Sequence, residues 1–142
     1  MLMEGEYEFL SNFYPCRIVD KDYPELIYSS VEAAYQANKT KSKAERSKFV
    51  SLLPGKAKRL GKKLVLRADW DSVKDSIMEY YLVQKFSSPE LRARLKNVSE
   101  PIVEDNYWND TYWGICNGVG LNKLGKLLEK VREAIISNKA FF

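Results

Sequence analysis

The spacing of apolar residues changes at Ser29, and this change is the strongest limit on how the chain can fold. Before Ser29, short apolar groups alternate with turn residues, a pattern typical of brief strands. After it, apolar residues recur at helical steps, most regularly near the C-terminus. That last apolar stripe consists of Leu121, Leu124, Leu128, Val131 and Ile135. The pattern predicts an α+β fold that is mostly helical with a small antiparallel sheet.

The same pattern places the individual elements. Strands are predicted at 7–10, 16–19 and 26–28, and a short strand or extended segment at 101–104. Helices are predicted at 29–39, 44–50, 56–63, 71–86, 89–97 and 121–135. We find no internal repeat, low-complexity tract or linker. Because 142 residues is an ordinary size for one domain, we expect a single domain over 1–142.

The chain contains no histidine. This absence excludes Ser-His-Asp and Cys-His catalysis and argues against a zinc site. We expect neither a metal nor a cofactor, and any acid–base chemistry would use carboxylates, lysines, tyrosines or bound water. The only cysteines, Cys16 and Cys116, are far apart in the sequence, and without an export signal both are expected to be reduced thiols.

The N-terminal segment lacks the basic and apolar regions of a signal peptide, and no apolar run approaches the roughly 18 residues of a membrane span. We therefore expect a cytoplasmic protein without a membrane partner. The net charge of +4 permits an anionic partner without requiring one. Basic residues at 56–63 point to different sides of the predicted helix, which favours a solvated surface. Arg67 is different, because an arginine beside Asp69 and Trp70 can form a fork for phosphate.

The stretch from Ser29 to Lys39 gathers polar side chains on one side of a predicted helix. Glu32, Gln36 and Lys39 fall within about 60° of one another around the helix axis, and Tyr35 flanks them. Ser29 and Glu32 have the spacing of a capping box, in which each side chain binds a free backbone amide. Two interpretations stay open: a solvated face with a structural glutamate, or the polar wall of a pocket.

Two loops carry further candidates for binding. The segment 106–114 is rich in aromatic, asparagine and aspartate side chains, which can stack on a nucleobase and hold ribose hydroxyls. Equally, it could be a wedge of aromatic core capped by turn residues. The segment Ser11-Asn12-Phe13-Tyr14 is a loop between predicted strands, a place where binding groups often lie.

Taken together, these stretches resemble the NADAR superfamily, also called YbiA-like. The resemblance covers about residues 7–132. Its motifs occur in the same order as in the family: Phe9-Leu10-Ser11-Asn12-Phe13, Val31-Glu32-Ala33-Ala34-Tyr35-Gln36-Ala37-Asn38-Lys39, Lys58-Arg59-Leu60-Gly61, Arg67-Ala68-Asp69-Trp70, Lys85-Phe86, Ile102-Val103-Glu104-Asp105-Asn106, Asp110-Thr111-Tyr112-Trp113-Gly114 and Asn122-Lys123-Leu124-Gly125-Lys126-Leu127-Leu128.

The resemblance implies an N-glycosidase, which hydrolyses the bond between a ribose and a nitrogen. One branch of the family acts on ribosylaminopyrimidine phosphate intermediates of riboflavin synthesis, and another removes ADP-ribose from guanine bases. The expected partner is therefore a small nucleotide-like molecule or an ADP-ribosylated nucleic acid. By position, Glu32 and Lys39 match the catalytic helix of the family. Its pocket motifs are matched by Asn12, Phe13, Trp70, Asp110, Trp113 and Gly114, to which we add Tyr35, Gln36, Arg67, Asp69 and Asn106 as substrate-binding candidates.

One position departs from the family pattern. Many relatives have histidine where this chain has Ala33. Because Ala33 lies roughly 100° around the helix from Glu32, we expect a supporting or packing role at that position. The departure leaves room for an alternative, a non-catalytic module that binds ADP-ribose or a nucleotide. In a third interpretation, of a structural or interaction protein, the matched residues are only core and caps.

Overall fold

The computed structural model describes residues 1–138, so the last four residues of the predicted domain lie outside the described part. Its contacts divide the chain into two compact units. The central unit runs from Asn12 to Lys85, and the terminal unit combines Met1–Ser11 with the segment that begins at Phe86. Each unit is described separately below.

The central unit opens with a two-stranded antiparallel sheet, as the sequence predicts. Strand β1 (Ile18–Val19) pairs with β2 (Ile27–Tyr28), and the register places Ile18 opposite Tyr28. Both of these side chains are buried. The two strands therefore turn one face toward the core.

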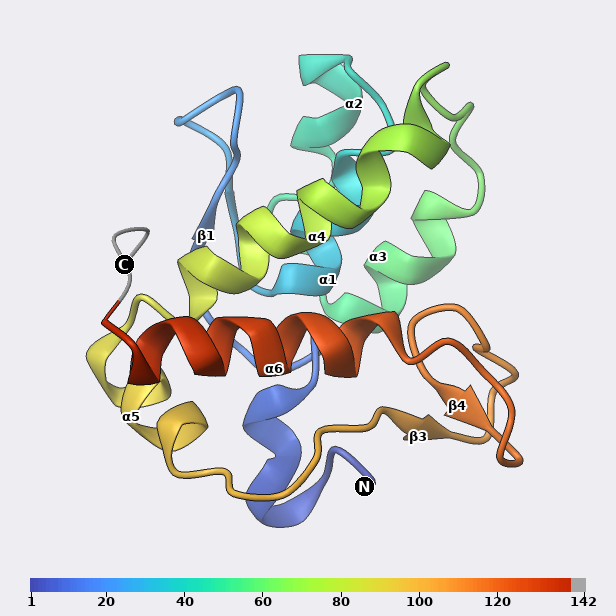
Figure 1. The fold of residues 1–142 in the computed structure, drawn as a ribbon. Helices are drawn as coiled ribbons and strands as arrows, with labels where there is room; N and C mark the ends of the chain where they lie inside the picture. The colour runs from blue at the N-terminus through green and yellow to red at the C-terminus, as the bar shows by residue number, and fades with distance from the viewer. Residues whose placement is uncertain (139–142) are drawn as a thin grey trace. The chain divides into compact units, whose positions relative to one another are not determined.

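Four helices follow in the central unit: α1 (Val31–Ala37), α2 (Lys43–Ser47), α3 (Pro54–Gly61) and α4 (Trp70–Lys85). Every side chain of α1 is buried, and the helix packs against both α3 and α4 (Figure 1). Ala33, Ala34 and Ala37 have no exposed surface, which lets the neighbouring helices approach closely. Helix α1 is the centre of this unit.

The terminal unit begins with a 3₁₀ helix, Gly5–Leu10, where the sequence predicts a strand at 7–10. The strand prediction is wrong because Phe9 and Leu10 are both buried, whereas successive strand residues point to opposite faces. The backbone N–H of Ser11 donates to the carbonyl of Glu8 at 3.0 Å, which closes the last turn.

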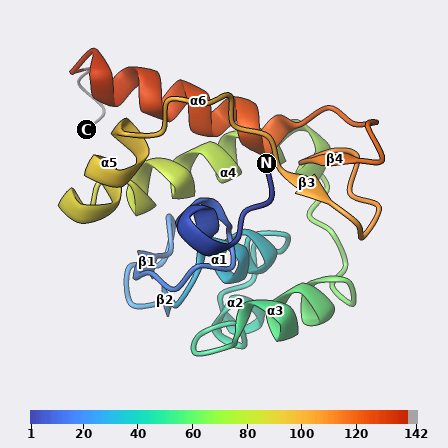
Figure 2. The ribbon, with the colours of Figure 1, turned by 90° about the horizontal axis from the view of Figure 1, so that it is seen from below.

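Helices α5 (Pro89–Lys96) and α6 (Lys123–Ile136) confirm two predictions and lie against each other (Figure 2). A pair of parallel strands, β3 (Asp105–Asn106) and β4 (Ile115–Cys116), was not predicted. Leu121 lies outside α6 and is half exposed, because the left-handed backbone of Asn122 (φ 50°) precedes the first helical residue.

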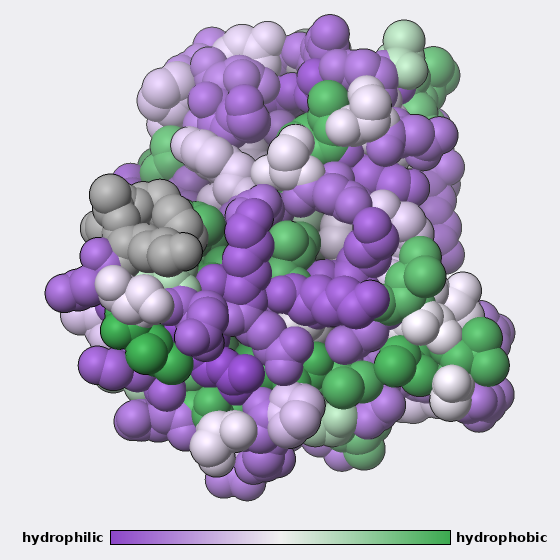
Figure 3. Space-filling view, in the orientation of Figure 1, coloured by the Kyte–Doolittle hydropathy of each residue, from purple (hydrophilic) through white to green (hydrophobic). Residues whose placement is uncertain are grey.

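Polar side chains cover most of the face shown in Figure 3, and smaller hydrophobic patches lie between them. Among residues 1–138, no helix combines the length and the apolar character that crossing a membrane requires. Cys16 and Cys116 are both free thiols, as the sequence predicts.

Candidate active site

The N-terminus of α1 differs from the prediction in one respect that matters for Glu32. The capping residue is Ser30, whose Oγ accepts a hydrogen bond from the N–H of Ala33 at 3.1 Å. The predicted capping box of Ser29 and Glu32 is therefore wrong by one residue, and Ser29 instead donates to the carbonyl of Leu52. Because Ser30 caps the helix, the Glu32 carboxylate is not committed to capping.

The carboxylate of Glu32 is held from within α1. Gln36, one turn later, donates from Nε2 to Oε1 of Glu32 at 2.8 Å. Both side chains are buried, with 8% of Glu32 and 5% of Gln36 exposed. The backbone N–H of Glu32 also donates to the carbonyl of Asn12 at 3.1 Å. A charge-capable side chain is thus fixed in position rather than left mobile at the surface.

Gln36 is in turn held by α3. A Cβ at Gly61 would lie 1.9 Å from Oε1 and 2.8 Å from Cδ of Gln36, so only glycine fits here without a shift. Oε1 has no hydrogen-bond partner among the described residues. Gly61, which the sequence places only in a family motif, sets the position of the amide that binds Glu32.

An aromatic pair lies beside this polar face. The rings of Tyr35, on α1, and Trp70, the first residue of α4, have centroids 5.1 Å apart. The ammonium of Lys39 lies 5.9 Å from the centroid of the Tyr35 ring, within the range of a cation–π interaction. The structure thus brings Tyr35, Trp70 and Lys39 together.

Lys39 lies just beyond the end of α1. Burial lowers the pKa of its amine from the usual value, while the nearby charge of Glu32 acts in the opposite direction. Nearby Lys58, Lys62 and Lys74 lower the pKa further. An amine with a lowered pKa is neutral for a larger fraction of the time and is a better nucleophile.

Arg67 supports the backbone at Lys39 instead of presenting a free fork. The backbone N–H of Arg67 donates to the backbone carbonyl of Lys39 at 2.7 Å. Its guanidinium makes two bonds to Asp69, Nε to Oδ1 at 2.7 Å and Nη2 to Oδ2 at 3.1 Å. The arginine holds the pKa of Asp69 below its usual value. The phosphate fork expected of Arg67 is occupied within the chain.

The predicted loop residues Asn12 and Phe13 have different environments. Asn12 is buried, its Nδ2 is 3.5 Å from the sulfur of Met78, and its Oδ1 has no partner in the part of the chain that the structure describes. Phe13 is 43% exposed. Asn12 therefore belongs to the buried surroundings of Glu32 through its carbonyl, and Phe13 presents an aromatic face at the surface.

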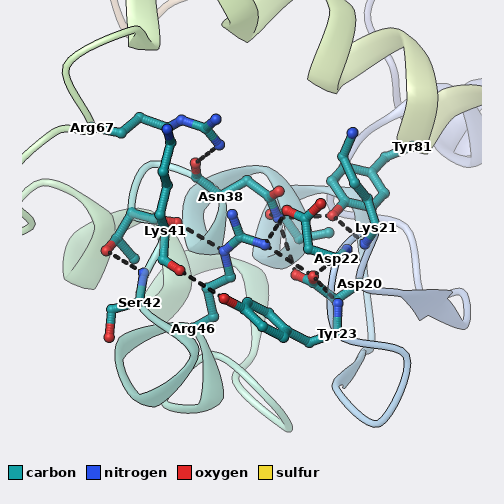
Figure 4. A network of polar contacts seen from close by, with 12 residues as sticks. Asp20, Lys21, Asp22, Tyr23, Asn38, Lys41, Ser42, Arg46, Arg67 and Tyr81 are labelled. Carbon is teal, nitrogen blue, oxygen red and sulfur yellow. Dashed lines mark hydrogen bonds and ion pairs between the residues drawn. The ribbon is translucent and has the colours of Figure 1, made fainter.

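A buried polar network, which the sequence did not reveal, fixes the end of α1 (Figure 4). Asp20 and Arg46 form an ion pair with an Nη1–Oδ1 distance of 3.0 Å, and both side chains are almost fully buried. Asn38 donates from Nδ2 to the carbonyl of Ala34, to Tyr81 and to Asp20. Residues from the β1–β2 turn, α2 and α4 thus form one network with Asn38, which ends α1 and precedes Lys39. Only a fold brings them together, because Asp20 and Tyr81 are 18 and 43 positions from Asn38 in the sequence.

Lys85, at the end of α4, is the second group that sequence reasoning missed. It is 2% exposed, and burial lowers the pKa of its amine to about 8. Cys16 lies within electrostatic range of it, and the Tyr14 ring is 5.7 Å from its nitrogen. The apolar pattern of the helix gave no signal for a buried lysine.

The candidates at 106–114 belong to the terminal unit, where Asn106 and Asp110 stabilise their own loop. Asn106 Nδ2 donates to the carbonyl of Asp110 at 2.9 Å, and Oδ1 of Asp110 accepts from the N–H groups of Tyr112 and Trp113. These bonds are the turn-forming interactions of asparagine and aspartate. The amides and carboxylates of this loop therefore have a structural role within it.

The aromatic residues of the same loop do not form a core wedge. Tyr107 is 85% exposed and Trp108 is also at the surface. Trp113 is half-buried, and a Cβ at Gly114 would lie 2.3 Å from the carbonyl of Glu104, so this glycine permits close backbone packing. An open pocket of about 470 Å³ adjoins the loop and is lined by Thr111, Tyr112, Val119, Gly120 and Leu121.

Within the described ranges, no three acidic or cysteine side chains gather closely enough to hold a metal ion. The site around the Glu32 carboxylate contains the Gln36 amide, the Lys39 amine and the aromatic rings of Tyr35 and Trp70.

Comparison with known protein families shows to which family the chain belongs. A sequence model described as the NADAR domain matches residues 2–136. The chain belongs to the NADAR family. This match confirms the resemblance seen in the sequence and covers both units.

Several NADAR relatives have functional names. A protein of Nostoc punctiforme named as an N-glycosidase is 34% identical over 138 residues, which cover 91% of this chain and 86% of the relative. N-glycosidase YbiA of Escherichia coli is 33% identical, covering 94% of this chain and 85% of the relative. A riboflavin biosynthesis protein of Vibrio vulnificus is 29% identical over 93% of this chain but only 36% of its own length.

The NADAR fold is also seen in a solved structure. The NMR structure of E. coli YbiA matches with a TM-score of 0.82 and 31% sequence identity, covering 97% of this chain and 83% of the other. This match confirms the α+β fold predicted from the sequence.

The position where the NADAR pattern departs from this chain is inside the core. Ala33 has no exposed surface, and its backbone N–H donates to the Ser30 cap. The methyl side chain of Ala33 is therefore fully buried, next in sequence to Glu32. Position 33 is thus buried, and the supporting or packing role expected for it stays a prediction.

Proposed function

We propose that this chain is an N-glycosidase that hydrolyses the bond between a ribose and a nitrogen, with Glu32 and Lys39 as its catalytic residues. The NADAR relatives of Nostoc punctiforme and E. coli carry that activity in their names. The observation that carries the assignment of residues is the hydrogen bond from Gln36 to Glu32, which orients a buried carboxylate near the start of α1. The partly buried Lys39 follows the end of the same helix. That arrangement supplies a proton carrier on α1 and an amine just beyond the end of the same helix.

Glu32 is proposed as the acid–base group. Cleavage of the C–N bond develops positive charge on the anomeric carbon and negative charge on the leaving nitrogen. Glu32 in its acid form gives a proton to that nitrogen, and the resulting carboxylate takes a proton from the attacking water. The products are a ribose hydroxyl and a protonated nitrogen, so the proton is returned to Glu32 and the reaction balances.

Lys39 has two roles that differ in chemistry. In the first, its ammonium stabilises charge that develops during simple acid–base hydrolysis. In the second, the ribosylamine opens to an imine, the neutral Lys39 amine adds to the anomeric carbon, and the original amine leaves with a proton from Glu32. Water then hydrolyses the Lys39 imine to an aldehyde sugar and a free amine. The lowered pKa of Lys39 supports the second role.

The proposed substrate is a ribosylaminopyrimidine phosphate. Its support is the Vibrio vulnificus relative, whose name places it in riboflavin biosynthesis. A ribosylamine opens readily to an imine, which fits the amine chemistry of Lys39. ADP-ribosylated guanine, in a nucleotide or a nucleic acid, is the competing substrate that the family resemblance implies.

A side-by-side hydrolysis assay on these two substrates tests the proposal. We expect release of the aminopyrimidine with wild-type protein and a loss of about 100-fold or more with Glu32→Gln, in line with general acid–base catalysis. Glu45→Gln, at a half-exposed glutamate of α2, is the control and should retain full activity. Near-normal turnover by Glu32→Gln would remove Glu32 from the mechanism.

Borohydride trapping separates the two roles of Lys39. Reduction during turnover should leave a sugar covalently attached to Lys39, detected as a mass increase on its peptide. Lys39→Gln should abolish the adduct, whereas Lys41→Gln, two residues along at an exposed position, should not. An active enzyme that yields no adduct would assign Lys39 to charge stabilisation.

Ala33 supports one competing function, a module that binds a nucleotide without cleaving it. Many family members have histidine at this position, and the buried alanine supplies no titrating group. Calorimetry with ADP-ribose, paired with a product assay, decides between the two. Binding without release of a base or an aminopyrimidine would favour the module.

A further inference from the structure

Three consecutive backbone carbonyls, those of residues 39–41, accept hydrogen bonds from distant parts of the central unit (Figure 4). The segment lies between α1 and α2, outside any helix or strand. The donors are the backbone N–H of Arg67 for residue 39, at 2.7 Å, Nε of Arg46 for residue 40, at 2.8 Å, and the hydroxyl of Tyr23 for residue 41, at 3.0 Å. The backbone that carries Lys39 is thus held by contacts from outside the segment.

Arg46 is itself fixed on its other side. Its Nη1 donates to Oδ1 of Asp20 at 3.0 Å, and 1% of the Arg46 side chain and none of the Asp20 side chain are exposed. The Asp20 carboxylate also accepts from the Tyr28 hydroxyl at 2.7 Å and from the backbone N–H groups of Asp22 and Tyr23. A guanidinium is planar with donors in fixed directions, so a fixed Nη1 also determines where Nε points.

The backbone of Lys39 determines where its amine lies. That amine is 5.9 Å from the centroid of the Tyr35 ring, and the Trp70 ring packs on the same Tyr35 ring at 5.1 Å. The backbone N–H of Trp70 donates to the carbonyl of Arg67 at 3.1 Å, and Arg67 donates to the carbonyl of Lys39. Lys39 and Trp70 are therefore linked through the Arg67 backbone, and their side chains meet at one ring. A shift of residues 39–41 would move the amine away from that ring.

The Asp20–Arg46 pair is an unusual choice for stability alone. Both ions lose their hydration when buried, and apolar residues of the same volume often stabilise a core equally well or better. An ion pair differs from apolar packing because its hydrogen bonds are strong and have a defined direction. The position of this pair beside residues 39–41 therefore favours a role in orientation.

We propose that Arg46 is a positioning residue for Lys39. Its guanidinium, fixed by Asp20, holds the carbonyl of Thr40, and this contact keeps the Lys39 amine over the Tyr35 ring. Because Arg46 is almost fully buried, it acts through the segment that it holds and not by touching a substrate. The inference rests on the proposed function in giving the Lys39 amine a catalytic role, whereas the hold on the backbone requires no turnover.

Arg46→Lys tests the proposal in the full chain. A lysine keeps a positive charge next to Asp20 but lacks the planar fork that reaches Asp20 and the Thr40 carbonyl together. Steady-state kinetics on the ribosylaminopyrimidine phosphate should show kcat lowered at least about tenfold, because a small misplacement of a reacting group is costly. KM should change by less than about twofold, since no contact with the substrate is lost.

Two variants are controls for this measurement. Asp22→Asn changes another acceptor of the same guanidinium, bonded to Nη1 at 2.8 Å and 45% exposed, without touching residues 39–41. Leu82→Ala removes a fully buried side chain near the other end of α4 from Trp70, and therefore destabilises the central unit by leaving a cavity. Both variants should keep the wild-type kcat. Equal losses of kcat in Leu82→Ala and Arg46→Lys would overturn the proposal in favour of general destabilisation.

Nuclear magnetic resonance measures the position of Lys39 without turnover. Wild-type protein should show nuclear Overhauser effects between the ε-methylene protons of Lys39 and the ring protons of Tyr35. These effects should weaken in Arg46→Lys and stay unchanged in Leu82→Ala. A lowered kcat with unchanged Overhauser effects in Arg46→Lys would overturn the proposal, because Arg46 would then not act through Lys39.

Asp20→Asn is a second variant for the case in which Arg46→Lys does not fold. It keeps the volume of Asp20 but replaces a charged acceptor of Arg46 by a neutral one, so kcat should fall about threefold and the Lys39–Tyr35 effects should weaken. A circular dichroism spectrum shows whether each variant is folded. Wild-type kcat and Overhauser effects in folded Asp20→Asn would reject the role of the Asp20–Arg46 pair.

Failure of this inference differs from failure of the proposed function. Absence of hydrolysis by the wild-type protein would reject the enzyme, while weaker Lys39–Tyr35 effects in Arg46→Lys would still support the hold on Lys39. Normal kcat and normal Overhauser effects in folded Arg46→Lys would keep the enzyme and reject Arg46 as a positioning residue.

Discussion

Gln36 packs so closely against Gly61 that a Cβ at position 61 would lie 1.9 Å from Oε1 of Gln36. The nitrogen of the same amide, Nε2, donates a hydrogen bond to Oε1 of Glu32. The two atoms that a new methyl group would meet most closely, Oε1 and Cδ, lie at the far end of a flexible side chain that can rotate away, whereas the Cβ of Gln36, at 3.1 Å, would have to shift slightly with α1. A substitution at Gly61 should disturb the proposed active site more than the fold.

Gly61→Ala should lower kcat about tenfold, because the displaced Gln36 loses its charged hydrogen bond, while the free energy of unfolding changes by no more than about 1 kcal/mol. Steady-state kinetics and urea unfolding measure the two effects. Gly55→Ala, on the same helix, is the control, since its Cβ would meet nothing closer than 3.9 Å. If the effect passes through Gln36, Gly61→Ala should add little to Gln36→Met; additive losses would contradict this route.

The helix cap gives a second prediction. Ser30→Ala should lower the free energy of unfolding by about 1 kcal/mol, because the N–H of Ala33 loses its acceptor at the buried start of α1. Ser29→Ala should cost less than half as much, since Ser29 donates only a 3.3 Å bond to Leu52 at the surface. Chemical unfolding of both variants checks the order. A larger loss for Ser29→Ala would restore the capping box predicted from the sequence.

The buried ion pair gives a third prediction. Arg46→Met should lower the free energy of unfolding by about 3 kcal/mol, because it leaves the Asp20 carboxylate buried without its cation. Lys48→Met breaks the exposed pair with Glu45 and should cost less than about 1 kcal/mol. Urea unfolding at neutral pH compares the two. Equal effects would mean that burial of the Asp20–Arg46 pair has no energetic weight.

Lys85 gives a prediction for pH dependence. Its pKa is about 8 in the folded chain and near 10.5 when unfolded, so between these values the unfolded state binds more protons. The free energy of unfolding should therefore rise as pH increases from 8 to 10.5. Lys85→Met should remove this rise and stabilise the protein at pH 7 by as much as about 3 kcal/mol. Lys96→Met, at an exposed position, should keep the wild-type slope.

Local signals predicted the helices better than the sheets. The leucine spacing that ends at Ile135 and the Ser88-Pro89 start were sufficient for α6 and α5, because helical contacts are close in sequence. The parallel pair of Asp105–Asn106 and Ile115–Cys116 is only two residues long on each side and follows from tertiary packing. No period can be read from so short a strand.

The candidate site was predicted in part for the same reason. Glu32, Gln36 and Lys39 belong to one predicted helix, so their spacing alone placed them on one side, although in the structure α1 ends two residues before Lys39. Gly61 and Trp70 come from other helices, and only the packing of α3 and α4 on α1 brings them against Gln36 and Tyr35. A one-residue error in the cap, Ser29 for Ser30, was enough to change the role expected of Glu32.

Asn38 determines where the backbone stops being helical, immediately before Lys39. Its amide holds the carbonyl of Ala34 and the hydroxyl of Tyr81, each at 2.8 Å, while Arg67 holds the carbonyl of Lys39. The conformational entropy of this segment is thus lost when the protein folds, before any ligand arrives. A ligand that binds the Lys39 amine therefore restricts only the rotamers of the Lys39 side chain, because the backbone that carries it is already ordered.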